Sequence, residues 1–210
     1  MKSSLAAFGV AFACVGCITY PTSDERFSDV IVATNRDPNT DFAAFDTFAI
    51  APAIDYLDAS ATNPMPVPLD GSVATPLSEE VARQFTLRGY EEVDPSDAPE
   101  LGVKITVIKS TVESYSYAPI WGYGSFSWGY YYPYFVPVYY GYDTTLVLID
   151  LIDVRSAVPA TANESQTQLP GVWTAGVYGV LENTVATEVG QAVEGIDQAF
   201  EQSPYLRSAQ

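Results

Sequence analysis

The chain has 210 residues, of which 48% are hydrophobic, and this length and composition predict one domain with a hydrophobic core. Its 9 Lys and Arg against 26 Asp and Glu give a net charge of −17, with the basic residues scattered and forming no patch, which argues against binding to nucleic acids. The absence of His removes Ser-His-Asp and Cys-His nucleophiles and the commonest zinc ligand, and no metal or cofactor is expected.

The first residues have the pattern of a bacterial export signal. Lys2 precedes an apolar run at residues 5–18, which is too short for a membrane-spanning helix of about 20 residues but suits a signal peptide. The run ends in Gly16 and Cys17, and this ending resembles the lipoprotein signal, in which the peptide is cut before a Cys that then carries lipid. We expect a signal peptide at residues 1–16, and a lipidated Cys17 with a tether over residues 17–40 that holds the protein on a membrane.

Three further readings of this region stay open. Cys14 stands where the lipoprotein signal usually has Leu and could itself carry the lipid, and a plain secretory signal is a second alternative. Cys14 and Cys17 also have a CxxC spacing, but a redox site needs a strand-to-helix context that is absent here. Ile18, rather than Asp, follows the Cys and resembles lipoproteins sent to the outer membrane, so we expect an outer-membrane, periplasm-facing protein.

The next elements alternate between strand patterns and turn signals. A short β-prone patch at residues 30–32 lies in an otherwise polar stretch, and alternation of apolar and small residues predicts a strand at about 46–51. Residues 52–75 contain several prolines and are expected to form a loop or linker.

The clearest helix signal follows at about residues 76–88. Thr75 is expected to cap it, Pro76 suits the first helical position, and apolar residues recur every four positions from Leu77 through Val81 to Phe85. Gly89 supplies the stop.

The second half of the chain predicts three strands and a helix. Residues 101–107 alternate, giving a strand with one wet face, whereas residues 144–154 are apolar on both faces, as in a doubly covered central strand. Residues 171–181 form another strand, with Trp173 on one face and Tyr178 on the other. A last amphipathic helix starts near residue 183 or 184 and stops before Ser203. Gly190 and Gly195 lower its helix propensity, so tertiary packing must hold it.

These elements predict an α+β fold. We expect an antiparallel sheet of about four strands with two helices packed on one face, in the order β-α-β-β-β-α, because few helices connect successive strands. A single domain at residues 41–206 would then contain a Tyr/Gly-rich loop at residues 115–142.

Several segments in this order resemble one family of bacterial lipoproteins, domain-of-unknown-function family 4136. They are DFAAFDTFAI at 41–50, LRGYEEVD at 87–94, LGVKITV, TTLVLIDLIDVRS at 144–156, GVWTAGV at 171–177 and the helix before SPY at 203–205. The family also tends to carry a Tyr/Gly-rich segment before its central strand, whereas Leu101 departs from an Asp that many members have. The resemblance implies location and fold but no mechanism.

The best candidates for chemistry are Asp150 and Asp153. A carboxylate pair for acid/base work must converge on one substrate, but residues three apart on a strand point to opposite faces, so these two cannot form a dyad. We expect Asp150 to be a structural residue bonded to backbone or to a neighbouring Thr or Tyr, and Asp153 to accept from the following turn, with Arg155. No catalytic residue is predicted.

The remaining candidate is the uncharged aromatic segment at residues 115–142. Its rings could pack on each other and on the sheet, could form a ligand surface, or could drive self-association, which Pro133 and Pro137 would oppose. For a ligand surface, the candidate contacts are Tyr115, Tyr117, Trp121, Tyr123, Trp128, Tyr130, Tyr132, Tyr134 and Tyr139.

The sequence therefore predicts a lipid-anchored envelope lipoprotein that serves binding or structural purposes without catalysis. Its partners are expected to be the membrane, through the anchor, and an envelope protein or polysaccharide, with no nucleic acid. The alternative is an envelope hydrolase that uses Asp150 with tyrosines of the aromatic segment.

Overall fold

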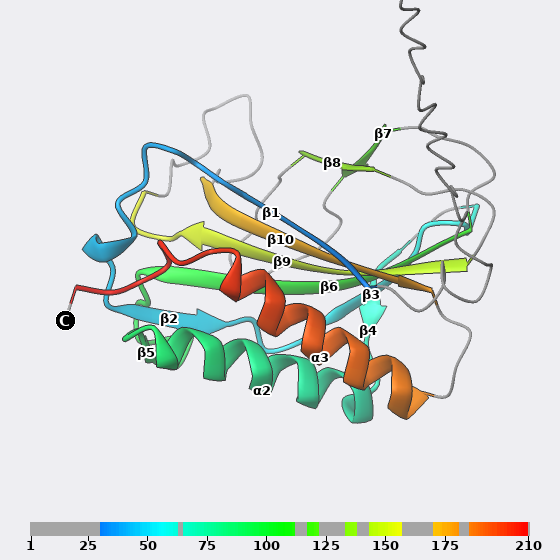
Figure 1. Cartoon of the computed structure of the whole chain (residues 1–210), viewed down its shortest axis with the longest axis horizontal. Helices are drawn as coiled ribbons and strands as arrows, with labels where there is room; N and C mark the ends of the chain where they lie inside the picture. Colours follow the sequence, from blue (N-terminus) through cyan, green and yellow to red (C-terminus); the bar gives the residue numbers. More distant parts are fainter. Residues whose placement is uncertain are drawn as a thin grey trace, which may run out of the picture.

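The computed structural model describes residues 30–62, 65–111, 117–121, 133–137, 143–156, 170–180 and 185–209 (Figure 1). In chain order the strands are β1 (Ile31–Arg36), β2 (Thr47–Ile50), β3 (Asp55–Asp58), β4 (Val67–Pro68), β5 (Glu91–Glu92), β6 (Leu101–Thr111), β7 (Tyr117–Trp121), β8 (Pro133–Pro137), β9 (Asp143–Asp153) and β10 (Gly171–Val180). The helices are the 3-10 turn η1 (Phe42–Ala44), α2 (Gly71–Leu87) and α3 (Val185–Glu201).

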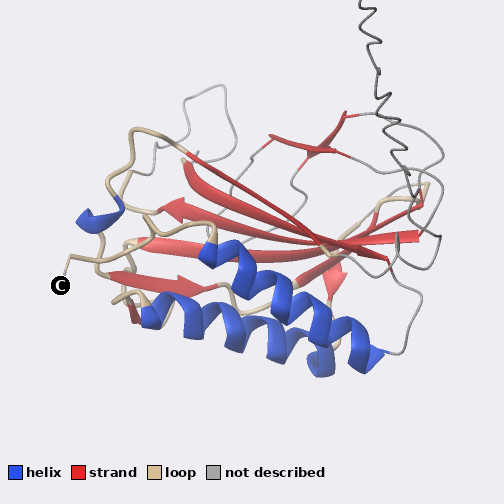
Figure 2. Cartoon of the chain, viewed as in Figure 1, coloured by secondary structure: helices blue, strands red, loops and turns tan. Residues whose placement is uncertain are grey.

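The strands form one large mixed sheet and one small ribbon. The order in the large, eight-stranded sheet is β1-β10-β9-β6-β2-β5, with β3 pairing with β6 and β4 pairing with β3. Helices α2 and α3 lie together on one face of this sheet (Figure 2), which confirms the α+β class and the two helices on one face.

The prediction of an antiparallel sheet of about four strands was wrong in two respects. The sheet has more strands, and β2 and β3 both run parallel to β6. Helix α2 lies between β2 and β6 in sequence and packs beside the sheet, so it acts as the crossover that parallel strands require.

Two regions expected to be irregular contain strands. Residues 52–75 hold β3 and β4, so the prediction of a loop there was wrong. Strands β2 and β3 pair with successive stretches of β6, and Pro52 lies in the break between them, where the chain lacks a donor for a continuous ladder. Strand β1 falls within the range expected for the tether and pairs with β10 at the edge of the sheet.

Helix α2 begins earlier than the sequence indicates. Asp70 caps it by accepting a hydrogen bond from the backbone nitrogen of Ser72 at 2.9 Å, so Pro76 lies inside the helix and Thr75 is not its cap. Asp70 rather than Thr75 caps the helix because its carboxylate oxygen reaches the free backbone N–H groups of the first turn. Gly89, with a φ of 91°, ends the helix as predicted.

The main core lies between the sheet and the two helices. The predicted stripe of α2, at Leu77, Val81 and Phe85, is almost completely buried, with exposed fractions of 1%, 0% and 0%. The Phe85 ring packs edge-on against Phe200 of α3 at 5.0 Å between centroids, and Phe200 lies 5.2 Å from the indole of Trp173 on β10. Helix α3 ends before Ser203, as expected, and the aromatic contacts join both helices to the sheet.

Candidate functional site

The face of the large sheet opposite α2 and α3 carries the most unusual combination of side chains. We call this surface, formed by alternate residues of β3, β6, β9 and β10, the helix-free face. Strand register arranges its residues in rows that run across the sheet, since residues paired between neighbouring strands share a face. Two of these rows differ sharply in chemistry.

The first row, which we call the polar row, consists of Lys104, Asp150 and Thr174, together with Asp55, which lies opposite Thr106 on β6 and is therefore a diagonal neighbour of Lys104. Strand register pairs Lys104 with Asp150, and Asp150 with Thr174. The ammonium of Lys104 lies 3.2 Å from a carboxylate oxygen of Asp55, and these side chains are 15% and 23% exposed. Removing most of the water from an ion pair costs desolvation energy, so the burial of this pair tends to destabilise the fold unless its other contacts compensate.

Asp150 is the most buried member of the polar row. It is 4% exposed, and the hydroxyl of Thr174 donates to its Oδ1 at 2.8 Å. This contact confirms the expected hydrogen bond between Asp150 and a neighbouring Thr. Such a carboxylate is held in place by the sheet, and its burial limits access by a substrate.

Asp153 has a different role at the end of β9. It accepts hydrogen bonds from the backbone nitrogens of Arg155 and Ser156 at 2.9 and 3.2 Å, and the Arg155 guanidinium lies 3.7 Å from it. The prediction that Asp153 accepts from the following turn is therefore confirmed. The two carboxylates have separate partners and lie on opposite faces of β9 by strand alternation, so no dyad forms.

The second row on the helix-free face is apolar. Leu57, Ile108, Leu146 and Tyr178 follow one another across β3, β6, β9 and β10. With Leu148, the leucines and isoleucine form a buried cluster against which Tyr178 packs. The doubly covered character predicted for β9 is confirmed, because Leu146 and Leu148 are buried on this face as well.

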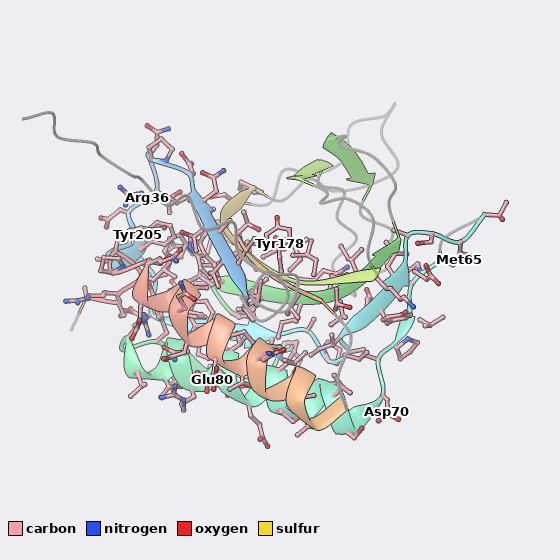
Figure 3. All side chains as sticks on the ribbon, turned by 45° about the vertical axis from the view of Figure 1, so that its right-hand side comes forward. Arg36, Met65, Asp70, Glu80, Tyr178 and Tyr205 are labelled. Atoms are coloured by element: carbon pink, nitrogen blue, oxygen red, sulfur yellow. The ribbon has the colours of Figure 1, made fainter. Side chains whose placement is uncertain are left out.

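Tyr178 lies on this face as predicted, opposite Trp173, whose side chain belongs to the main core. Figure 3 shows Tyr178 on the side of the sheet away from the helices. A Cβ at Gly176 would come within 2.9 Å of the Tyr178 ring, so only glycine lets this ring lie close over β10.

The ribbon of β7 and β8 lies on the same side of the large sheet as the helix-free face (Figure 1). It places three of the predicted contact residues, with Tyr117 opposite Pro137, Trp121 opposite Pro133 and Ile120 opposite Tyr134. Because proline cannot donate to a ladder, Pro133 and Pro137 limit the pairing of a further strand with β8. The other predicted contacts, Tyr115, Tyr123, Trp128, Tyr130, Tyr132 and Tyr139, and the lipidation residue Cys17 lie outside the described residues.

Sequence reasoning did not find the polar row. Alternation in β6 indicates that Lys104 faces the wet side, but its meeting with Asp55 and Asp150 depends on strand register, which no local pattern in these segments specifies. Within the described ranges, no group of three or more Cys, Asp or Glu residues is placed to hold a metal ion. Among those same residues, no helix is long and apolar enough to cross a membrane.

Comparisons with known proteins agree with this fold. The family model described as domain of unknown function, DUF4136, matches residues 32–205. The crystal structure of a DUF4136 family protein from Bacteroides thetaiotaomicron is similar, with a TM-score of 0.62 and 26% identity over 85% of this chain and 97% of that chain.

Two further solved structures have weaker likeness. A PelC variant dodecamer from Paraburkholderia phytofirmans gives a TM-score of 0.40 at 13% identity, over 87% of this chain and 100% of that chain. A PDZ domain protein from Parabacteroides distasonis gives 0.46 at 16% identity, over 86% of this chain and 37% of that chain. No curated protein matches this sequence.

Proposed function

The chain belongs to the family of domain of unknown function DUF4136, and we propose that it is a lipid-anchored protein of the bacterial cell envelope. The support is its N-terminus, which resembles a lipoprotein signal ending at Cys17. Cys17 carries the lipid, and the domain faces the periplasm from the outer membrane. In this proposal the segment at residues 115–142 binds an envelope polysaccharide, and the protein catalyses no reaction.

The observation that carries the binding proposal is the pairing of an uncharged aromatic segment with the helix-free face. Residues 115–142 contain no charged residue although the chain has a net charge of −17. The β7–β8 ribbon of this segment lies beside the sheet face that α2 and α3 leave uncovered. Tyr and Trp rings offer flat apolar surfaces with a polar edge, which suits stacking on the apolar faces of sugar rings.

The polar row supports the same location for the ligand. Asp55 and Lys104 keep 23% and 15% of their side chains exposed, so they remain accessible for hydrogen bonds to hydroxyl groups. Sugars present many hydroxyls beside apolar ring faces, and a site with both aromatic and charged groups matches this mixture.

The competing hydrolase would use Asp150 with tyrosines of the segment. The low exposure of Asp150 and its bond to Thr174 favour a structural role instead. The variant Asp150→Asn should lower the free energy of unfolding, since the amide oxygen is a weaker acceptor for the Thr174 hydroxyl than the carboxylate. Neither the wild type nor this variant is expected to hydrolyse polysaccharide. Loss of a measurable polysaccharide hydrolysis in folded Asp150→Asn would favour the enzyme.

The binding proposal is tested by cosedimentation of the purified protein with isolated peptidoglycan sacculi. We expect the double variant Trp121→Ala with Trp128→Ala to bind about thirtyfold more weakly, since each of the two lost ring contacts is worth on the order of 1 kcal/mol and about 1.4 kcal/mol is a factor of ten. Met65→Ala is the matched control, because Met65 is an apolar side chain 74% exposed outside the segment. Figure 3 shows it protruding from the domain.

Three results would change this conclusion. If the folded double variant sediments as the wild type does, the aromatic segment does not form the binding site. An equal loss in Met65→Ala would indicate nonspecific adhesion through exposed apolar groups. If wild-type protein does not sediment with sacculi but crosslinks in cells to an envelope protein through residues 115–142, the ligand is that protein and not the polysaccharide.

A further inference from the structure

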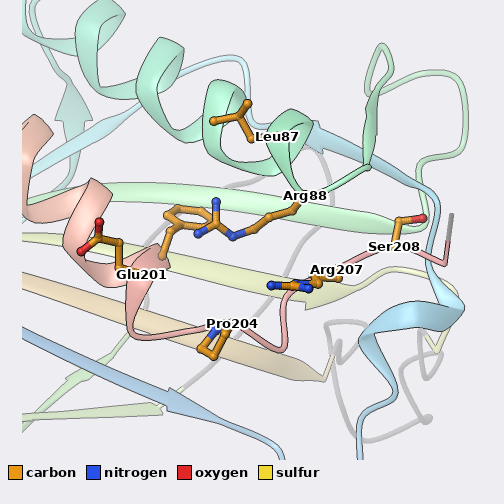
Figure 4. Close-up of a pocket in the computed structure, with 7 residues that line it drawn as sticks. Leu87, Arg88, Glu201, Pro204, Arg207 and Ser208 are labelled. Atoms are coloured by element: carbon orange, nitrogen blue, oxygen red, sulfur yellow. The ribbon is translucent and has the colours of Figure 1, made fainter.

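A hollow lies at the point where α2 and α3 both end. It has a volume of about 580 Å³ and contains two arginines, Arg88 and Arg207. Figure 4 shows both guanidinium groups reaching into the space between the end of α2 and the segment after α3. The hollow lies away from the β7–β8 ribbon (Figure 1), so its role does not depend on the proposed binding of polysaccharide.

Arg88 is held rigidly at the wall of this hollow. Its Nη1 donates to the backbone oxygen and to the Oε1 of Gln84, at 3.1 and 2.6 Å, and its guanidinium lies 4.9 Å from the centroid of the Phe200 ring. These contacts fix the group but use only one of its three nitrogens, and a guanidinium has five N–H donors. Among the described residues, no carboxylate forms an ion pair with Arg88.

Arg207 is less constrained than Arg88 and also forms no ion pair with a described carboxylate. Its side chain makes no hydrogen bond or ion pair within the described part of the chain, and the residue is exposed. Burial lowers the pKa of Arg88, and the charge of Arg207 lowers it further, whereas the carboxylate charge of Asp197 on α3 has the opposite and larger electrostatic effect. Only one acidic side chain, Glu201, lines the hollow, and it forms no ion pair with either arginine.

This arrangement is unusual in so acidic a protein. The chain has only 9 basic residues against 26 acidic ones, yet two of the 9 line one hollow, and neither forms an ion pair with Glu201, which lines the same hollow. Placing like charges together costs energy that an opposite charge in the same space would recover. Helix capping explains Arg88, because its bond to the Gln84 carbonyl satisfies the last turn of α2, but it does not explain Arg207.

We infer that the hollow between the ends of α2 and α3 binds an oxyanion, a carboxylate or a phosphate, carried on a ligand with an apolar group. The guanidinium groups of Arg88 and Arg207 donate to the oxyanion, since planar N–H donors match the geometry of carboxylate and phosphate oxygens. Leu87, which is 66% exposed, and Pro204 supply an apolar wall for the remainder of the ligand.

The test is isothermal titration calorimetry of the full chain in detergent with four probes: acetate, benzoate, inorganic phosphate and phenyl phosphate. We expect one oxyanion class to bind, and its phenyl-bearing member to bind more tightly than its small member. Binding by the carboxylate pair or by the phosphate pair identifies the group that the hollow takes. Failure of all four probes to bind at millimolar concentration overturns the inference.

Variants locate the binding. Arg207→Gln should raise the dissociation constant by about tenfold or more, which corresponds to about 1.4 kcal/mol. It should leave the fold unchanged, because Arg207 has no partner in the described chain. The matched control is Arg83→Gln, which removes an exposed arginine of α2 that pairs with Glu80. Equal affinity of wild type and Arg207→Gln, or an equal loss in Arg83→Gln, would refute a site at this hollow.

Discussion

Alanine substitutions at the two glycines of α3 test how closely this helix packs on the sheet. A Cβ at Gly195 would lie 2.3 Å from the Cγ1 of Val177 and 3.0 Å from the Cγ1 of Val30, whereas a Cβ at Gly190 would meet nothing within 4 Å. Alanine at either position gains up to about 1 kcal/mol of helix propensity over glycine. At Gly195 this gain is opposed by overpacking, which typically costs about 1–3 kcal/mol and here involves a contact that real Cβ atoms do not make.

We therefore expect opposite signs for the two substitutions. Gly195→Ala should lower the free energy of unfolding by about 2 kcal/mol, because α3 must move away from β10. Gly190→Ala should leave it unchanged or raise it by up to about 1 kcal/mol. The measurement is urea unfolding followed by far-UV circular dichroism, with the free energy taken by linear extrapolation.

A double-mutant cycle separates the steric effect from other causes. Val177→Ala removes the atom that the new Cβ would meet at 2.3 Å, so Gly195→Ala should cost at least about 1 kcal/mol less in that background. If Gly195→Ala is as stable as Gly190→Ala in the wild-type background, α3 does not lie this close to β10 and the reasoning fails. If the cycle shows no coupling, the cost has a source other than Val177.

Three other predictions concern a buried hydroxyl, a buried indole and the anchor. Tyr90→Phe should cost about 1 kcal/mol, since the buried Tyr90 hydroxyl donates to the Phe42 carbonyl at 3.0 Å. Burial raises the pKa of Tyr90, so the folded state favours the neutral phenol. The stability that this provides is complete below the unfolded pKa of about 10 and declines as the pH rises above it. In urea unfolding from about pH 8 to 11, the free energy of unfolding should therefore decline less steeply in Tyr90→Phe than in the wild type. Trp173→Phe should cost about 2 kcal/mol in urea unfolding, because the indole nitrogen donates to the Oγ of fully buried Ser203 at 3.0 Å, and a cost near zero would contradict this role. Cys17→Ser should abolish palmitate labelling and release the protein from membranes in cell fractionation, whereas a variant that stays labelled would place the lipid elsewhere.

Much of the fold was accessible from local patterns. The stripe at Leu77, Val81 and Phe85 identified the buried side of α2, and apolar residues on both faces identified β9 as the doubly covered strand. These predictions succeeded because burial repeats with the period of the element itself. The start of α2 was placed too late because Thr75 with Pro76 is also a plausible beginning, and only the structure shows that Asp70 holds the first turn.

Strand direction and register were not accessible in this way. Whether β2 runs parallel to β6 depends on how α2 crosses the sheet, which is a property of the whole chain. The short strands β4 and β5 have two residues each, too few to show an alternating pattern. The polar row follows from register, since a shift of β9 by one residue would turn Asp150 to the helix-covered face.

The two arginines of the hollow show the same limit for electrostatics. Read along the chain, the basic residues are scattered and indicate no patch, but the fold brings Arg88 and Arg207 to the same hollow. Arg88 follows α2 and Arg207 follows α3, and they meet because both helices run in the same direction across one sheet face and therefore end side by side. A count of charges gives the average field of a protein, which here repels anions. The local field at a hollow depends on which few side chains the topology brings together, so a strongly acidic chain can still offer a site for an oxyanion.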